Sequence, residues 1–191
     1  MPRFTREQLE ACRGMEVPDL LGDDVRLLFV GINPGLWTAA TQTHFAHPAN
    51  RFYPALLLAG IITHPVDPSA GMTDEDRDHL RLRGIGITNL VRRATARASE
   101  LTEDELREGG RELEALVARV RPRVVAVAGI TAYRAAFSLR RAVPGRQPAD
   151  LNGSELWVVP NPSGLNAHET IATLAEAYGA AARAAGVLAQ S

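Results

Sequence analysis

The sequence predicts an α/β fold with a mostly parallel sheet that helices cover on both faces. Three observations support this prediction. Four short apolar runs are typical of buried strands: "VRLLFV" (25–30), "GIGITNL" (84–90), "VVAVAG" (124–129) and "ELWVVP" (155–160). Helical segments separate the runs, and this alternation favours parallel strands. With 191 residues, 46% of them hydrophobic, the chain is long enough for one well-packed domain spanning 1–191.

The first half of the chain carries clear helix signals. In residues 1–22, Thr5-x-x-Gln8 fits a capping box ahead of Leu9, which predicts a short helical extension. The segment "NRFYPALLLAG" (50–60) predicts a second helix that ends at its glycine. A Pro-rich loop then leads to an acidic helix over 74–83.

The second half follows the same pattern. Thr102-x-x-Glu105 forms a capping box that opens a long amphipathic helix. Another helix follows the third apolar run and continues through Phe137. The segment 144–154 is rich in turn residues, and an Ala-rich helix is expected over 169–188.

Two absences from the composition exclude whole classes of chemistry. Cys12 is the only cysteine, which excludes a four-cysteine iron–sulfur cluster, a cysteine zinc site and an internal disulfide. All 21 basic residues are arginine, so no lysine amine can form a Schiff base. The five histidines show no metal-ligand spacing. We therefore expect no metal and no cofactor, and any reaction at a sugar carbon must use water.

Net charge and hydropathy bear on the binding partners and the cellular location of the protein. The net charge of −1 argues against a polycation, but arginines cluster at 92–97 and at 140–146, and a local patch is enough to bind phosphates. Taken alone, each cluster is more simply explained as solvated surface charge. No apolar run approaches the roughly 20 residues that a membrane span needs. We expect a cytoplasmic location, at the nucleoid if the source is bacterial.

Two related phrases follow the first and the fourth predicted strand: "VGINPGL" (30–36) and "VPNPSGL" (159–165). In open α/β sheets, ligands bind beyond the carboxyl ends of the strands. Two such loops at that edge predict a shared cleft. The alternative is that both are only good turns, because Asn, Pro and Gly favour turns for local reasons.

Five segments, in order, carry a resemblance to a known family: "GINPGL" (31–36), "FAHPANRF" (45–52), "GITNLVRRAT" (86–95), "REGGREL" (107–113) and "NPSGL" (161–165). The sequence resembles the mismatch-specific uracil-DNA glycosylases, the branch that includes the thymine-DNA glycosylases. The resemblance implies a three-layer α/β/α sandwich around a short four-stranded sheet. It also implies excision of uracil opposite guanine from double-stranded DNA, with thymine and damaged pyrimidines as further candidates. We expect one monomer to be sufficient.

The resemblance assigns the chemistry to the first loop. Asn33 stands where the most active related uracil glycosylases have an aspartate, and it is the expected catalytic residue. Its amide can orient water but is a poor base, so the reaction would be slow and would depend on departure of the base as an anion. Gly31 and Ile32 belong to the expected base pocket, in which Phe45 stacks on the base and the backbone amides near Ile32 and Phe45 bind its edge. Asn89, after the second strand, either supports the water or the base, or caps its turn.

The second loop is expected to contact DNA. A glycosylase flips its target nucleotide out of the helix and must fill the gap. Leu165 is the predicted wedge, and Asn161, Ser163, Gly164 and Asn166 complete the contact with the orphaned guanine. Read without the family, Asn33 can cap its own turn, Phe45 can be a core residue, and Leu165 can pack on the following helix.

Two other classes of function stay open. One is a DNA-lesion binder without catalysis, and the other is an α/β nucleotide-binding protein without a role on DNA. Neither a Walker lysine nor a G-x-G-x-x-G motif follows the first strand, which argues against the second class. Release of free uracil separates an enzyme from a binder.

Overall fold

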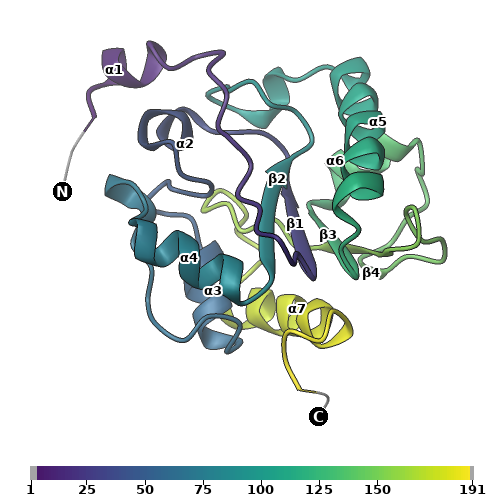
Figure 1. Ribbon diagram of the computed structural model, residues 1–191. Coiled ribbons are helices and arrows are strands. Elements are labelled where there is room, and N and C mark those ends of the chain that lie inside the picture. Colours follow the sequence, from purple (N-terminus) through teal and green to yellow (C-terminus); the bar gives the residue numbers. More distant parts are fainter. Residues whose placement is uncertain (1–3, 190–191) are drawn as a thin grey trace.

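A computed structural model describes residues 4–189 and shows a central sheet between two layers of helices (Figure 1). The strands are β1 (Leu27–Gly31), β2 (Ile85–Asn89), β3 (Val124–Ala128), β4 (Gly145–Arg146) and β5 (Glu155–Val159). Their order across the sheet is β2-β1-β3-β5-β4. All four predicted strands are confirmed, and they run parallel to one another. The three-layer α/β fold is therefore the predicted one.

Alternation along the strands divides the core into two layers. Leu27 and Phe29 of β1 face one layer of helices, and Leu28 and Val30 face the other. Every side chain of β1 and β3 is buried, because helices cover both sides of the central strands. This double burial explains why these strands read as continuous apolar runs rather than as alternating patterns.

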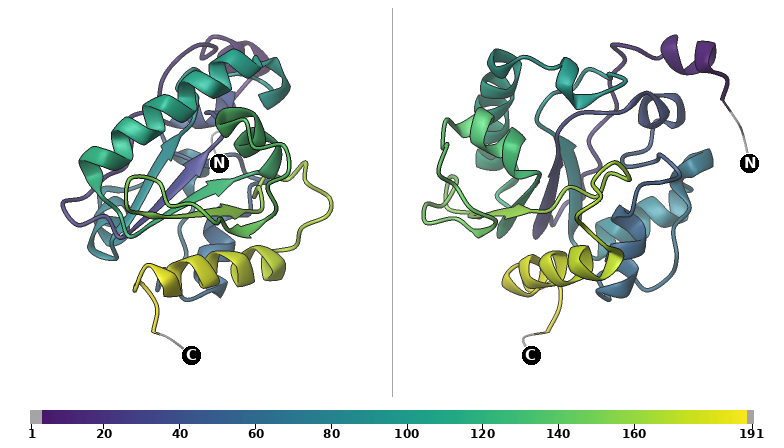
Figure 2. Two further views of the ribbon diagram at one scale, coloured as in Figure 1. Left: turned by 90° about the vertical axis from the view of Figure 1, so that its right-hand side faces the viewer. Right: turned by 180° about the vertical axis from the view of Figure 1, so that it is seen from behind.

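Seven α-helices surround the sheet within the described residues: α1 (Arg6–Glu10), α2 (Leu36–Thr41), α3 (Phe52–Leu58), α4 (Asp74–Leu82), α5 (Glu103–Val120), α6 (Ile130–Phe137) and α7 (Ile171–Ala184). Helices α5 and α6 cover one face, whereas α3, α4 and α7 cover the other (Figure 2). The capping boxes predicted at Thr5 and Thr102 are both present. None of the helices in residues 4–189 is long and apolar enough to cross a membrane.

Three details differ from the prediction. The N-terminal helix occupies only Arg6–Glu10 of the expected 1–22 extension, and residues 1–3 of that extension lie outside the described part of the chain. A fifth strand, β4, pairs antiparallel with β5 inside the segment read as turns. Helix α2 begins directly after "GINPG", with Gly35 at its N-cap. The sequence predicted a loop here and no helix after it.

The parallel sheet brings the carboxyl ends of four strands to one edge of the molecule. The "GINPG" loop leaves β1 there and the "NPSGL" loop leaves β5, with β3 between them. The loop after β2 reaches the same edge, where Leu90 and Val91 donate backbone hydrogen bonds to the carbonyls of Gly31 and Ile32. The topology thus brings three loops together.

Candidate active site

A cavity of about 720 Å³ opens at this edge of the sheet. Its volume lies within the range of roughly 300–1,000 Å³ that is usual for ligand sites. Nine of the ten predicted site residues line it: Ile32, Asn33, Phe45, Asn89, Asn161, Ser163, Gly164, Leu165 and Asn166. The tenth, Gly31, lies beneath the cavity floor.

The side chain of Asn33 is held by three hydrogen bonds through one atom. Its Nδ2 donates to the carbonyls of Pro34 (3.2 Å) and Arg93 (3.0 Å) and to Oγ1 of Thr95 (2.8 Å). Because a backbone carbonyl can only accept, two carbonyls fix the amide with its nitrogen toward them. Within residues 4–189 no donor contacts Oδ1, and Asn33 lines the cavity. The oxygen is therefore the free end of a fixed amide.

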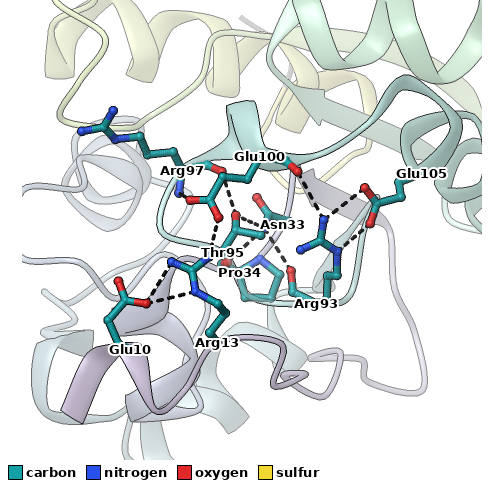
Figure 3. A network of polar contacts seen from close by, with 9 residues as sticks. All are labelled: Glu10, Arg13, Asn33, Pro34, Arg93, Thr95, Arg97, Glu100 and Glu105. Atoms are coloured by element: carbon teal, nitrogen blue, oxygen red, sulfur yellow. Dashed lines mark hydrogen bonds and ion pairs between the residues drawn. The ribbon is translucent and has the colours of Figure 1, made fainter. Parts of the chain in front are cut away.

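A wider polar network continues from Asn33 to the N-terminal helix (Figure 3). The Thr95 hydroxyl donates to the carbonyl of Arg97 at 2.9 Å, and the Arg97 amide donates to the Glu100 carboxylate at 2.9 Å. Glu100 also pairs with Arg13, beyond the end of α1. The chain of contacts thus ties the loop that carries Thr95 to residues preceding the sheet.

Phe45 presents an aromatic ring to the cavity. One face of the ring stacks on Phe52, with centroids 4.1 Å apart and planes inclined by 25°. Its backbone has a φ of 56°, in the left-handed region that bulky residues avoid at a cost of about 1–3 kcal/mol. Such strain is typical of functional positions, where the surrounding structure holds a residue in place.

Position 31 requires a glycine because the side chains of Asn89 and Phe45 pack directly against its backbone. A Cβ at this position would lie 2.4 Å from Oδ1 of Asn89 and 3.3 Å from the ring of Phe45. Any side chain would therefore displace both. The glycine lets an amide oxygen and an aromatic ring meet over the end of β1.

Asn89 has one polar partner in the described structure, the buried ring of His44. The Asn89 Nδ2 lies 3.2 Å from His44 Nδ1, and the opposite ring nitrogen lies 2.9 Å from the carbonyl of Pro18. Only 5% of His44 is exposed. Burial lowers the pKa of this imidazole below its ordinary value of 6.5.

The second loop is organised by short-range bonds of its own. Asn161 Oδ1 accepts from the Ser163 amide at 3.0 Å, and the Asn166 side chain donates to the Asn161 carbonyl at 3.1 Å. Leu165 stands at the tip with 89% of its surface exposed. The alternative in which Leu165 packs on the following helix is therefore not observed.

Arg51 joins the second loop to the rest of the cavity wall. Its guanidinium donates to the carbonyls of Ser163 (2.6 Å), Asn166 (2.7 Å) and Glu169. Gly164 packs so closely that a Cβ there would lie 2.7 Å from the carbonyl oxygen of Ala49. The segment around Ala49 and the second loop thus interlock.

The arginines of the cluster at 92–97 differ in whether they form an ion pair. Arg92 pairs with Asp19, and Arg93 pairs with Glu105, whose pKa the guanidinium holds down at about 2. Arg97 lines the cavity, and its side chain has no carboxylate partner within residues 4–189. Arg97 is therefore the cation of this cluster that is available to an anion.

Three residues around the cavity escaped the sequence reasoning: Thr95, Arg51 and His44 in these roles. Thr95 and Arg51 lie within segments that carry the family resemblance and His44 directly precedes one, but their partners are distant in sequence. Trp37, two residues after the first Asn-Pro-Gly turn, does not line the cavity. Its indole donates to the Ser69 carbonyl at 3.0 Å and packs against Phe4.

Comparisons with known proteins identify the family of the chain. The family model described as the uracil DNA glycosylase superfamily matches residues 18–181, which is more than half of the chain. The chain belongs to the uracil DNA glycosylase superfamily. The match includes both Asn-Pro loops and leaves out helix α1.

A solved structure supports the same fold for this glycosylase. A protein from Methanosarcina acetivorans, provisionally described as a uracil DNA glycosylase and solved by NMR in solution, is 19% identical with a TM-score of 0.58. The alignment covers 87% of the present chain and 98% of the other. Membership of the superfamily makes the chain a DNA glycosylase, a hydrolase that acts on DNA.

Proposed function

We propose that the protein removes uracil opposite guanine from double-stranded DNA and leaves the strand intact. The observation that carries this proposal is the fixed amide of Asn33, whose nitrogen is fully engaged and whose oxygen is free at the cavity. A water that donates to this oxygen would be held beside the sugar of a nucleotide in the cavity. Thymine and damaged pyrimidines opposite guanine are further candidate substrates.

The reaction follows from what an amide can and cannot do. The C1′–N1 bond breaks and its electron pair leaves with the base as an anion, while positive charge spreads over the sugar. The water bound to Asn33 Oδ1 then forms the new bond to C1′, and its proton passes to solvent or to the departing base. Because Asn33 does not accept that proton, positioning supplies most of the rate. A base that forms a more stable anion departs faster, so uracil should be excised in preference to cytosine.

Recognition of the base uses the floor of the cavity. The free face of Phe45 would stack on the pyrimidine, a contact worth about 1–3 kcal/mol. The backbone N–H groups of Ile32 and Phe45 have no backbone acceptor among residues 4–189 and are available to carbonyl oxygens of the base. Asn89, beside Phe45, completes this edge.

The second loop would hold the DNA open. Leu165 is an exposed apolar tip on a compact turn and is suited to enter the gap left by a flipped nucleotide. Backbone groups at Gly164 and Asn166 would contact the orphaned guanine, and this contact would produce the mismatch preference. Asn161 and Ser163 shape the turn.

The test is single-turnover release of uracil from duplexes with uracil opposite guanine, compared with uracil opposite adenine and cytosine opposite guanine. We expect the parent to release uracil from the first duplex fastest, and to give strand breaks only after alkali treatment. Asn33→Ala should lose about 100-fold or more in rate, the usual cost of removing one preorganised polar group from an active site. Far-ultraviolet circular dichroism verifies that the variant is folded.

Two results would contradict the proposal. A folded Asn33→Ala variant as fast as the parent removes the catalytic role. A parent that retains mismatched DNA but releases no base is a lesion binder instead.

A further inference from the structure

We propose that His44 determines which bases the cavity accepts, by fixing the orientation of the Asn89 amide. The inference rests on the proposed function, because it concerns the selection of the base. His44 itself is a positioning residue behind the cavity wall: it does not line the cavity that Asn89 lines. Its effect on the base would pass entirely through Asn89.

The position of the proton on His44 follows from its partners. The Pro18 carbonyl, 2.9 Å from Nε2, can only accept a hydrogen bond, so Nε2 carries the proton. A neutral imidazole protonated at Nε2 has a bare lone pair at Nδ1. Asn89 lies 3.2 Å from this Nδ1 and must present its amide nitrogen to it. The Pro18 carbonyl therefore fixes the tautomer of His44, and His44 in turn fixes the orientation of the Asn89 amide.

The orientation of the amide leaves its oxygen for the ligand. With Nδ2 toward His44, Oδ1 of Asn89 lies over Gly31, next to the Phe45 ring. No donor within residues 4–189 contacts Oδ1. It is a hydrogen-bond acceptor at the edge of the surface on which the base would stack. Uracil and thymine carry an N–H at ring position 3 and can donate to it, whereas cytosine has a lone pair there and would be repelled.

The surroundings keep the imidazole neutral. Burial lowers the pKa of His44, and so does the positive charge of Arg92, whereas the Pro18 carbonyl and Asp19 act in the opposite direction. Arg77 and Arg81 lie on the far side of His44, around a second cavity of about 230 Å³, and Tyr53 donates its hydroxyl to the His44 carbonyl. Protonation at Nδ1 would place a donor against a donor, and Asn89 would have to turn over. We therefore expect the base preference to persist below pH 6.5 and to be lost once His44 becomes charged.

Two substitutions separate orientation from packing. His44→Leu retains an apolar side chain of similar size but offers Asn89 no acceptor. His44→Gln carries an amide nitrogen that donates and a carbonyl oxygen that accepts, joined through a single carbon, so it can supply both the donor and the acceptor that the neutral ring presents. The readout is the affinity for duplexes that carry 2′-fluorinated uridine or 2′-fluorinated cytidine opposite guanine, because the electron-withdrawing fluorine makes the glycosidic bond resist hydrolysis.

We expect the ratio of uridine to cytidine affinity to fall about ten-fold in His44→Leu, the equivalent of one hydrogen bond to the base. In His44→Gln most of the ratio should be retained. A loss of stability alone would weaken both duplexes equally and would leave the ratio unchanged. Nitrogen-15 NMR of the parent supplies an independent reading, in which we expect His44 to be protonated at Nε2 and bare at Nδ1.

An unchanged ratio in His44→Leu, or a proton at Nδ1 in the parent at neutral pH, overturns the inference and leaves the proposed function standing. Failure of the proposed function itself gives a different result. A parent that binds neither fluorinated duplex better than undamaged DNA, and frees no uracil, overturns the proposed function and the selection of bases with it. The NMR measurement would then still decide whether His44 orients Asn89.

Discussion

The two Asn-Pro loops are similar in sequence, but different hydrogen bonds hold them in place. In the first loop, the Asn33 side chain reaches outward and bonds to a segment about 60 residues later in the chain. In the second, the Asn161 side chain bonds to its own loop, and Arg51 holds that loop from outside. The same dipeptide thus serves once to fix the Asn33 amide beside the cavity and once to shape a turn that projects Leu165. Loop sequence alone does not reveal which role applies.

The largest effect in this comparison is expected at Arg51. Arg51→Met removes a charged donor from three carbonyls of the second loop, and hydrogen bonds to charged groups contribute about 1.5–3 kcal/mol each to stability. We expect a loss of about 3 kcal/mol in the free energy of unfolding, measured by urea denaturation, which is less than the sum of three such bonds because the freed carbonyls can bond to water instead. Proteolysis within 161–169 should become faster. Arg51→Lys, which keeps the charge but can reach fewer carbonyls, should lose less. Equal stability of parent and Arg51→Met would show that the second loop holds itself.

Thr95→Val tests the anchoring of the first loop. The substitution keeps the shape of the side chain but removes the acceptor from Asn33 Nδ2, which frees the amide to tilt. We expect single-turnover excision to slow about ten-fold, the equivalent of one neutral hydrogen bond at the upper end of its range. Thr95→Ser retains the hydroxyl and should restore most of the rate. If the two variants behave alike, the carbonyls of Pro34 and Arg93 suffice to hold Asn33.

Leu165→Ala tests the projecting tip of the second loop. Because Leu165 is exposed, the change should leave the free energy of unfolding unaltered. Removing its apolar surface from a DNA gap should cost roughly 1 kcal/mol, or about five-fold in affinity for an abasic site opposite guanine. Leu165→Met, which keeps the apolar bulk, serves as the matched control. Unchanged affinity and excision in Leu165→Ala would show that another group fills the gap.

The smallest effect is expected at Arg97, beside the first loop. If this unpaired guanidinium contacts a phosphate, Arg97→Ala should weaken binding for every duplex alike. It should also reduce the slope of log affinity against log salt by about 1. Arg140→Ala removes the same charge outside the cavity lining and should leave the slope unchanged. A slope that Arg97→Ala does not alter would place the phosphate contacts elsewhere.

The sequence predicted the parts of the fold that depend on local signals. The continuous apolar runs located all four parallel strands, and capping boxes located the starts of α1 and α5. Strand β4 was missed because its two residues pair with β5 through tertiary contact rather than through any propensity of their own. Helix α2 was missed because Gly35, which acts as its cap, also marks turns.

In the candidate site, too, the sequence predicted some features and not others. Strand ends and the family resemblance together predicted which residues would gather, and nine of the ten line one cavity. Their orientations depend on partners far away in the chain, such as Thr95 for Asn33, Arg51 for the second loop and His44 for Asn89. No local pattern encodes these pairings, because each joins residues that lie 45 or more positions apart in the chain.

The central claim concerns one oxygen atom. The most direct test is a crystal structure of the parent with a duplex that carries 2′-fluorinated uridine opposite guanine. We predict an ordered water within hydrogen-bond distance of Asn33 Oδ1 and about 3–3.5 Å from C1′ of the flipped nucleotide. A water held at C1′ by another group, or an Asn33 oxygen turned away from the nucleotide, would contradict the account.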